Sequence, residues 1–223
     1  MSRTKLPVVL EKDEAEAILT QPNTGCPTGL RNRAILEVMY RAGLRVSEVI
    51  NLKPGDIRWN SGILEVRGGK GGKDRNVPVD SETLGWLRAW QGQRPGRRQR
   101  FFTTLQGKPL SPRYLQQLVK RLAHKAGLER ADQVTPHVFR HTYATELLNC
   151  GFTIREVQTL LGHANVSTTQ IYTHISPQVL TAKIRGRRVN GEGDQQIREM
   201  AKTLSELPAE AKATIISLLQ SFD

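Results

Sequence analysis

The sequence predicts a mainly α-helical fold that includes a small three-stranded antiparallel β-sheet. Apolar residues recur at helical spacing through most of the chain, and Ser-Pro and Thr-Pro pairs mark two helix starts. Between residues 56 and 79 the apolar period changes to two, which is typical of strands. A chain of 223 residues with 38% hydrophobic content can bury the core of one large domain, with or without an appendage.

Three helices are expected before the sheet. Residues 10–19 have an acidic first turn and apolar positions at helical spacing, and residues 30–41 show the same spacing. We place Pro27 in the loop that joins them. A third helix begins at Ser47, so Arg45 lies in the tight joint between the second and third helices, with packed elements on both sides.

The predicted sheet consists of three short strands, which are DIRWN, GILEVRG and RNVPV. The turn between the last two strands, GGKGGK, carries Lys70 among four glycines, which let the backbone approach a phosphate closely. Taken alone, this turn is better explained as a flexible, solvated hairpin.

Further helices are expected after the sheet. One covers residues 81–91, and another begins at Ser111 and leaves a basic face for solvent or DNA. Two more begin at Thr135 and Thr153, where a threonine side chain can cap free amides. A short segment that begins at Ser167, STTQIYTHI, forms the next one.

The strongest overall signal is a formal net charge of +12. Excess positive charge most often indicates a polyanionic partner, and double-stranded DNA is the partner we expect. A solvated basic surface is the plainer alternative. An aromatic content of 5% argues against a stacking platform for single strands. No apolar run has the length of a membrane span or of a signal-peptide core, so we expect a cytoplasmic protein that does not contact a membrane.

The charge is unevenly spread along the chain. The segment from Asn190 onward has three basic and six acidic residues, so residues 1–189 hold an excess of fifteen positive charges. The sequence NGEGD at 190–194 is a predicted linker. We therefore expect a basic domain over residues 1–189 and an acidic, amphipathic helical tail over residues 195–223, which we do not expect to touch DNA.

The stretch 135–174 is dense in side chains that suit phosphate chemistry. Its first helix places His137 and Arg140 within about 100° of arc, beside a helix N-terminus that favours anions. His163 follows the glycine that ends the next helix, and Tyr172 lies on the short segment beyond it, so the two can reach one pocket. Each of these residues alone is better explained by capping or packing.

Together, these side chains match the needs of phosphodiester cleavage. The reaction requires a nucleophile, cations that neutralise charge in the transition state, and an acid for the departing oxygen. Tyr172 could attack, Arg45 and Arg140 could hold the phosphate through their guanidinium groups, and Lys70 could protonate the leaving oxygen. The two histidines titrate near neutrality and suit proton transfer or hydrogen bonding.

No metal or cofactor is expected at this site. No acidic cage of the kind that holds Mg²⁺ accompanies the cluster, so a metal-free reaction is favoured. Cys26 and Cys150 lack the spacing of a metal site and are too few for a disulfide framework, so both are predicted to be ordinary thiols.

Four boxes of the sequence resemble those of the tyrosine recombinase (phage integrase) family, in the family's order and spacing. They are GLRVSE at 43–48, GKGGKDR at 69–75, HVFRHT at 137–142 and LGHANVSTTQIYTH at 161–174. A single box is a weak signal, but a chance match of four boxes in register is very improbable. The similarity covers roughly residues 6–188 and is nearest to Xer-type and integron-type members.

The resemblance implies the tyrosine recombinase catalytic-domain fold over residues 1–189. It also implies DNA cleavage through a 3′-phosphotyrosyl intermediate and strand exchange through a Holliday junction. Because the covalent link conserves the energy of the bond, neither ATP nor a metal is implied. Glu48 matches an acidic position of structural support, and His141 is better explained as a packing group. The family's six active-site positions fall on Arg45, Lys70, His137, Arg140, His163 and Tyr172.

Family members usually carry an N-terminal helical domain that clamps the opposite face of the DNA. This chain starts where the catalytic domain normally starts, so either that domain was removed or the protein is minimal, and weaker DNA binding is expected. In the family, the helix after the tyrosine commonly docks on a neighbouring protomer, and residues 176–188 could be that helix. We therefore expect self-association on DNA through residues 176–223, with a tetramer in the synapse.

Two alternatives remain open. One is a DNA-binding accessory protein that has the recombinase fold but no recombination activity, although all six active-site residue types are present. The other is a type IB topoisomerase, which uses similar chemistry as a monomer and would relax circular DNA rather than recombine it.

Overall fold

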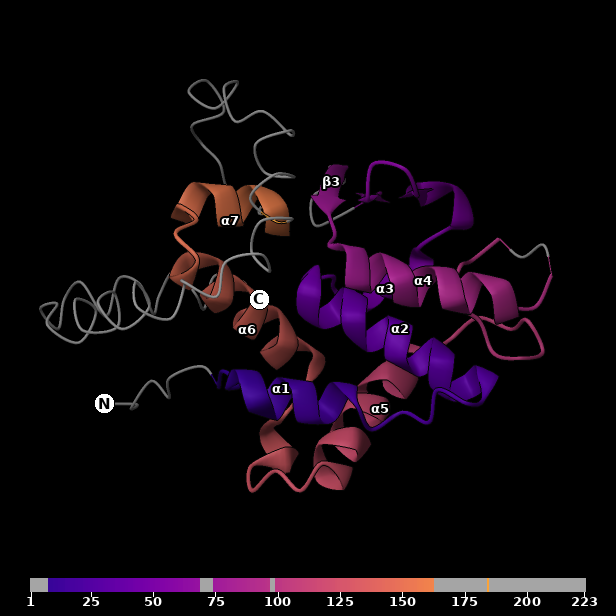
Figure 1. Cartoon of the computed structure of the whole chain (residues 1–223), viewed down its shortest axis with the longest axis horizontal. Coiled ribbons are helices and arrows are strands. Elements are labelled where there is room, and N and C mark those ends of the chain that lie inside the picture. Colours follow the sequence, from indigo (N-terminus) through magenta and orange to yellow (C-terminus); the bar gives the residue numbers. More distant parts are fainter. Residues whose placement is uncertain (1–7, 69–73, 97–98, 163–183, 185–223) are drawn as a thin grey trace, which may run out of the picture.

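The computed structural model describes residues 8–68, 74–96, 99–162 and 184. Helices dominate this part of the chain, and a small sheet lies to one side of them (Figure 1). The predicted fold class is confirmed. The elements in chain order are α1 (Lys12–Leu19), α2 (Pro27–Arg41), α3 (Val46–Asn51), the 3-10 helix η1 (Pro54–Asp56), β1 (Ile57–Arg58), β2 (Ile63–Val66), β3 (Arg75–Pro78), α4 (Ser81–Gln93), α5 (Pro112–Lys125), the 3-10 helix η2 (Ala131–Gln133), α6 (Pro136–Asn149) and α7 (Ile154–Leu161).

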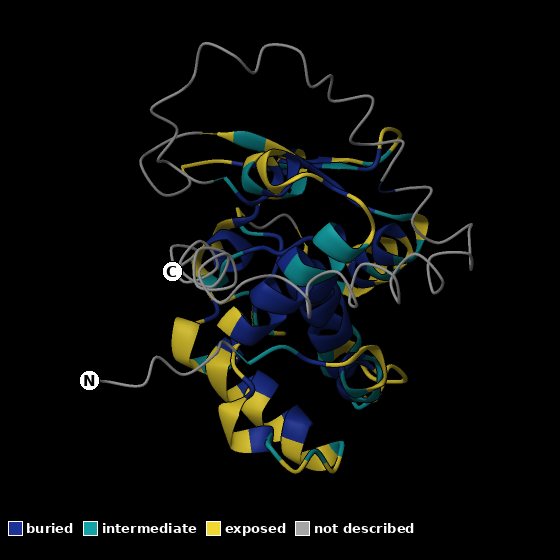
Figure 2. Ribbon diagram, turned by 90° about the vertical axis from the view of Figure 1, so that its left-hand side faces the viewer, coloured by how far each residue is buried: buried dark blue, intermediate teal, exposed yellow. Residues whose placement is uncertain are grey.

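Helix α2 is the centre of the fold. It contacts α1, α3, α4 and α6, and most of its side chains are buried. The apolar positions from which the helix was predicted, such as Ala34, Ile35 and Val38, are completely buried. Figure 2 shows buried residues running through the middle of the molecule, with exposed residues on the outer helices. Helices α3 and α6, near whose starts the predicted site residues Arg45 and Arg140 lie, are therefore attached to a well-packed body.

Helix α2 begins at Pro27, so the prediction of a loop at this residue was wrong. Proline suits the first turn of a helix, because the amide it lacks would have no partner inside the helix. The preceding turn folds closely over the new helix, since a Cβ on Gly29 would lie 1.8 Å from the carbonyl oxygen of Asn23. Apolar spacing alone revealed the helix only from Leu30 onward.

The three strands pair in the order β1-β2-β3 and are antiparallel throughout. Val66 pairs with Arg75, so the β2-β3 hairpin leads directly into the turn that carries Lys70, which lies outside the described residues. Strand β1 is shorter than the predicted DIRWN because Asp56 belongs to η1. There its carboxylate accepts the backbone N–H of Lys53 at 2.9 Å.

Side-chain caps define the helix starts around the site. The side chains of Asp80, Ser111, Thr135 and Thr153 each accept the backbone N–H three residues further on, at the starts of α4, α5, α6 and α7. The starts predicted at Ser111, Thr135 and Thr153 are confirmed. Local sequence therefore fixes where α6 and α7 begin, and with them the position of Arg140.

The buried apolar residues form two clusters. The larger one surrounds α2 and extends along the chain as far as Phe139 of α6. The smaller one lies between α6 and α7 and includes Tyr143, Phe152, Leu160 and Ile184. The first turns of α6 thus belong to the main body, and its later turns support α7.

No helix in the described ranges is long and apolar enough to cross a membrane. Cys26 and Cys150 are both exposed thiols. The predicted linker at 190–194 and the tail at 195–223 lie outside the described residues.

Candidate active site

Three of the six predicted site residues belong to the described part of the chain. Arg45 precedes α3, and His137 and Arg140 lie in the first turns of α6. The other three lie outside the described residues and are Lys70, His163 and Tyr172.

Arg45 is the N-cap residue of α3, and its side chain is 17% exposed. Its backbone N–H donates to Oε2 of Glu48 at 2.8 Å, and its Nη1 donates to Oε1 of the same carboxylate at 3.1 Å. Glu48 therefore holds both the backbone and the guanidinium group of Arg45. This arrangement agrees with the supporting role expected of Glu48.

Arg140 reaches from α6 to two backbone oxygens and is only 3% exposed. Its Nη1 donates to the carbonyl oxygen of Gly43, and its Nη2 donates to that of Leu161 at 2.7 Å. Nη1 of Arg45 approaches the same Leu161 oxygen at 3.4 Å. The two guanidinium groups predicted to hold a phosphate thus converge on one backbone oxygen at the end of α7.

Gly43 makes this close packing possible. Its φ is +60°, and a Cβ at this position would lie 2.4 Å from Cδ1 of Tyr143 and 2.9 Å from Cδ2 of Leu161. Only glycine combines this backbone conformation with so close an approach. Gly43 therefore also brings a carbonyl oxygen within reach of Arg140.

A third arginine, Arg75, joins the site from the first position of β3. Its Nη1 and Nη2 donate to the two carboxylate oxygens of Glu48 at 2.7 and 2.8 Å, and its Nε donates to the carbonyl oxygen of Leu160 at 2.9 Å. Sequence reasoning missed this residue. The only signal for it is its place at the end of the GKGGKDR box, directly after the turn with Lys70. We call Arg45, Glu48, Arg75 and Arg140 the arginine cluster.

The end of α7 is the common anchor of this cluster. Gly162 terminates the helix with φ 71° and ψ 56°, a left-handed conformation that glycine adopts readily. Carbonyl oxygens in the last turn of a helix lack partners within the helix and form the negative end of its dipole. Those of Leu160 and Leu161 accept hydrogen bonds from all three arginines of the cluster. The predicted site residue His163 follows directly after this anchor.

Positive charge is in excess within the arginine cluster. Burial raises the pKa of Glu48, but the hydrogen bonds and charge of Arg75, with the amide of Arg45 and the charge of Arg140, lower that pKa overall to about 2. Burial, followed by the charge of Arg45, lowers the pKa of Arg140 to about 9, although Glu48 opposes this shift. An anion that bound here would relieve the repulsion between the guanidinium groups.

Two buried nitrogen atoms of the cluster have no hydrogen-bond partner among the described residues. They are Nη2 of Arg45 and Nε of Arg140. Buried donors in folded proteins are nearly always paired, and an unpaired one is costly. A ligand with several oxygen acceptors would satisfy both atoms.

The histidines of α6 occupy different environments. His137 is exposed in the first turn, whereas His141, one turn later, is buried. The burial of His141 agrees with its expected role as a packing group. No three side chains of the metal-binding types His, Cys, Asp and Glu gather into a candidate metal site within the described ranges.

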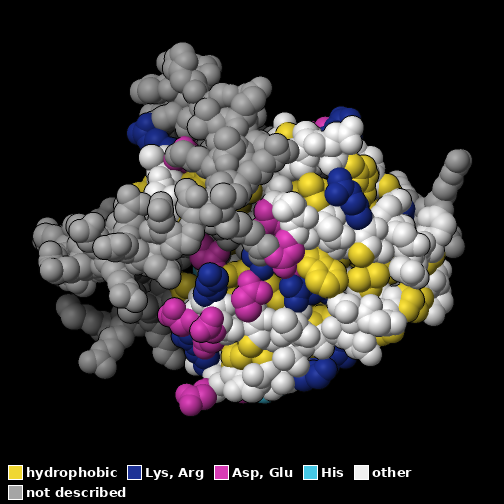
Figure 3. All heavy atoms as spheres, in the orientation of Figure 1, with side chains coloured by type: hydrophobic (Ala, Val, Ile, Leu, Met, Phe, Trp, Pro, Cys, Tyr) yellow, Lys and Arg dark blue, Asp and Glu magenta, His cyan; other side chains and the backbone are white. Residues whose placement is uncertain are grey.

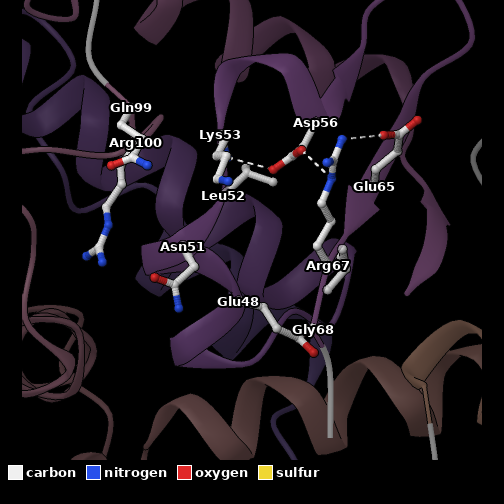
Figure 4. A pocket seen from close by; sticks show the side chains of 11 residues that line it. Glu48, Asn51, Leu52, Lys53, Asp56, Glu65, Arg67, Gly68, Gln99 and Arg100 are labelled. Carbon is white, nitrogen blue, oxygen red and sulfur yellow. Dashed lines mark hydrogen bonds and ion pairs between the residues drawn. The ribbon is translucent and has the colours of Figure 1, made fainter. Parts of the chain in front are cut away.

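A cavity of about 460 Å³ borders the arginine cluster and shares Glu48 with it (Figure 4). On one wall Arg67 lies between Asp56, at 3.0 Å, and Glu65, at 3.3 Å. On the opposite side lie Gln99 and Arg100. The basic and acidic side chains around the cavity are equal in number and are Lys53, Arg67, Arg100, Glu48, Asp56 and Glu65. The excess of positive charge therefore belongs to the cluster and not to the cavity.

Comparisons with known proteins agree with this arrangement. The profile of the phage integrase family matches residues 8–178. The tyrosine recombinase XerD of Ralstonia nicotianae is 42% identical over 184 residues, which cover 79% of this chain and 58% of the relative.

Two solved structures extend the comparison. The XerA recombinase is 34% identical with a TM-score of 0.65, over 81% of this chain and 65% of that one. The XerH site-specific recombinase, solved bound to its difH substrate in a pre-cleavage complex, is 29% identical with a TM-score of 0.63, over 82% of this chain and 55% of that one. The chain thus spans less than two thirds of the length of each of these relatives.

Proposed function

The chain belongs to the phage integrase family, and from this premise we propose that it is a site-specific DNA recombinase that cleaves and rejoins DNA through a 3′-phosphotyrosine intermediate. The arginine cluster is the observation that carries the proposal. It sets three guanidinium groups against one carboxylate and contains two buried donors without a described partner. A phosphodiester offers one negative charge and two non-bridging oxygens, so it matches both features.

Arg45 and Arg140 are the proposed phosphate clamp. Both are fixed by the protein before any ligand arrives, through Glu48 and the end of α7. Donors that are already in place need little reorganisation when charge develops on the phosphate in the transition state. The lowered pKa of Arg140, about 9, supports this role because a bound anion would favour its charged form.

Tyr172 is the proposed nucleophile. Its oxygen attacks the scissile phosphorus, the bond to the 5′-oxygen breaks, and the phenol proton passes to His137 or His163. Lys70 gives a proton to the departing oxygen, which leaves as a 5′-hydroxyl. The energy of the broken bond is kept in the phosphotyrosyl link, so rejoining is the reverse reaction and consumes no ATP. This chemistry requires no metal ion and no organic cofactor.

Double-stranded DNA is the proposed partner. Arg113 and Arg121 on the exposed face of α5 add positive charge to that of the cluster, as binding to a phosphate backbone requires. We propose that residues 1–189 form the catalytic domain and that residues 176–223 join protomers, as a tetramer in the synapse. The protein would act on DNA in the cytoplasm.

Covalent capture of DNA tests this function. The protein is incubated with genomic fragments, denatured, and the DNA that remains attached is sequenced to identify the site. A nicked oligonucleotide of that site then traps the intermediate. We expect a covalent adduct that maps to Tyr172, none with Tyr172→Phe, and unchanged DNA binding by that variant. The control is Tyr114→Phe, which removes a hydroxyl that donates to Asn32 at 2.8 Å and should leave the adduct intact.

The remaining outcomes separate the alternatives. Adduct formation by Tyr172→Phe would contradict the assignment of the nucleophile. Relaxed circles without joint molecules would favour a type IB topoisomerase, and binding without any adduct would favour an accessory protein.

A further inference from the structure

Arg75 joins the carboxylate of the arginine cluster to the end of α7. It begins β3, immediately after the turn that carries Lys70. Its two terminal nitrogens hold the carboxylate of Glu48 on α3, and its Nε holds the carbonyl oxygen of Leu160 on α7. One side chain therefore links three elements that are distant in the sequence.

These contacts use the whole fork of the guanidinium group. All three nitrogens donate at 2.7 to 2.9 Å, two of them to one carboxylate and the third to a backbone oxygen in another element. The side chain is 8% exposed, so water competes little for these bonds. A lysine keeps the charge, but it cannot present three nitrogens in fixed directions.

The groups that Arg75 holds position the proposed phosphate clamp. Glu48 binds the backbone and Nη1 of Arg45, and the oxygen of Leu161, next to Leu160, accepts from both Arg45 and Arg140. A shift of Arg75 would therefore reach both clamp arginines, one through Glu48 and the other through the end of α7.

Packing also ties Arg75 to the end of α7. A Cβ on Gly162 would lie 2.7 Å from Cδ of Arg75, and Gly162 has φ +71°. The arginine stem thus crosses the helix end where there is room only for glycine. The chain leaves this point toward His163.

We propose that Arg75 is a positioning residue for DNA cleavage, which fastens β3, α3 and the end of α7 together so that Arg45 and Arg140 meet the phosphate in one fixed geometry. This inference rests on the proposed function, and it adds a residue that is not among the six active-site positions.

Arg75→Lys and a matched control, Arg130→Lys, test the proposal. Arg130 makes the same kinds of contact with residues that do not belong to the cluster. It donates to Glu14 at 2.6 and 3.2 Å and to the carbonyl oxygen of Val9 at 2.9 Å. With saturating nicked substrate, Arg75→Lys should lower the cleavage rate constant by about 10- to 100-fold, because a clamp displaced by a fraction of an ångström stabilises the transition state poorly. Its Kd for DNA should stay within about threefold, and Arg130→Lys should change neither quantity. Cleavage by Arg75→Lys at the wild-type rate would overturn the proposal.

The pH profile distinguishes positioning from simple packing. In the native protein the pKa of Glu48 is about 2, so Glu48 stays ionised in any practical assay. In Arg75→Gln the buried carboxylate loses its main partner, its pKa rises, and cleavage should weaken as the pH falls toward about 5. Adding Glu48→Gln to this variant should remove the new acid limb. A profile of wild-type shape in Arg75→Gln would contradict the proposed link through Glu48.

Hydrogen exchange supplies a readout that needs no activity. Amides in the last turn of α7 should exchange faster in Arg75→Lys than in the native protein and should be unchanged in Arg130→Lys. If the native chain formed no adduct with DNA, the proposed function would fail, and exchange would still decide whether Arg75 holds α7. Unchanged exchange in Arg75→Lys would refute that contact.

Discussion

Two buried groups of arginine and glutamate in the described part of the chain differ in charge balance. We call the first the α2 cluster. Glu37 of α2 lies between Arg33 and Arg41, with a distance of 2.7 Å to each. Glu16 of α1 and Glu82 of α4 approach the same arginines at 2.6 and 3.5 Å. Figure 3 shows acidic and basic side chains side by side on the surface in this view. Carboxylates outnumber guanidinium groups in the α2 cluster, whereas guanidinium groups outnumber carboxylates three to one in the arginine cluster.

The different charge balance of the two clusters shifts the pKa of their arginines in opposite directions. Burial lowers the pKa of Arg41, but the charges of Glu37 and Glu16 raise it overall above its ordinary value. Burial and the charge of Arg45 lower the pKa of Arg140 to about 9. Arg41 and Arg140 are 8% and 3% exposed, so burial alone does not separate them. A buried arginine thus indicates an anion site only where nearby carboxylates fail to balance it.

Glu37→Gln would break the balance of the α2 cluster. It removes the carboxylate that two buried arginines share, and loss of one partner from a buried ion pair costs about 3–5 kcal/mol in free energy of unfolding. Urea denaturation measures this loss. The control is Glu65→Gln, which removes the carboxylate paired with the exposed Arg58 at 2.7 Å and should change the stability little, because solvent screens exposed ion pairs.

The comparison also predicts that Glu37→Gln leaves the rate of DNA cleavage unchanged. Folded variant protein should cleave DNA at the wild-type rate, because Glu37 is held by Arg33 and Arg41 and takes no part in the described hydrogen bonds of Arg45 and Arg140. A slower reaction at the same folded fraction would show that the two clusters are coupled.

Acid titration should distinguish the contribution of Glu48 to the free energy of unfolding from that of Glu37. The folded-state pKa of Glu48, about 2, lies below its ordinary value of 4.5, so the stability it contributes is complete above about pH 4.5 and is lost as the pH falls toward 2. That contribution is about 3 kcal/mol. The pKa of Glu37 is raised, mainly by burial and against the charges of Arg41 and Arg33. The ionised carboxylate of Glu37 is therefore not a source of the stability that is lost in acid.

Urea midpoints between about pH 2 and 6 measure both contributions. Glu48→Gln should flatten the loss of stability in acid, and Glu37→Gln should not. Parallel curves for Glu48→Gln and the native protein would show that the carboxylate of Glu48 is not held by the arginines.

The features of the fold that depend on neighbouring residues in the sequence were predictable. Helical spacing and caps identified most helices, including the starts at Thr135 and Thr153, and a change of period identified the sheet. The α2 cluster was not predictable, because charged residues four apart on a helix usually mark a solvated face. Here α1 and α4 cover that face of α2. Its burial depends on tertiary packing, which the local sequence does not show.

The site was predictable only in part for a similar reason. Sequence boxes indicated Arg45 and Arg140, and the structure brings both to Leu161. Arg75 was missed because its contact with Leu160 spans 85 residues of the chain and depends on where β3 meets α7. No periodic pattern encodes such a contact.

Sulfate should stabilise the native protein through the arginine cluster, by less than the contributions expected of Glu37 and Glu48. Sulfate resembles a phosphate in charge and oxygen geometry, so it should bind near the two buried donors of Arg45 and Arg140. A ligand that binds only the folded state adds about 1.4 kcal/mol to the free energy of unfolding at ten times its Kd. Thermal unfolding in sulfate and in chloride of equal ionic strength measures the gain.

Sulfate also stabilises most proteins without binding a site, because it is excluded from their surfaces. Arg140→Gln separates the two effects, since it keeps the surface and removes one arm of the clamp. Arg130→Lys retains the cluster and should gain as much as the native protein. If Arg140→Gln gained equally, the sulfate effect would be general, and charge imbalance would not be enough to create an anion site. A gain confined to proteins with an intact arginine cluster would show that the unbalanced charge, and not burial, selects the anion.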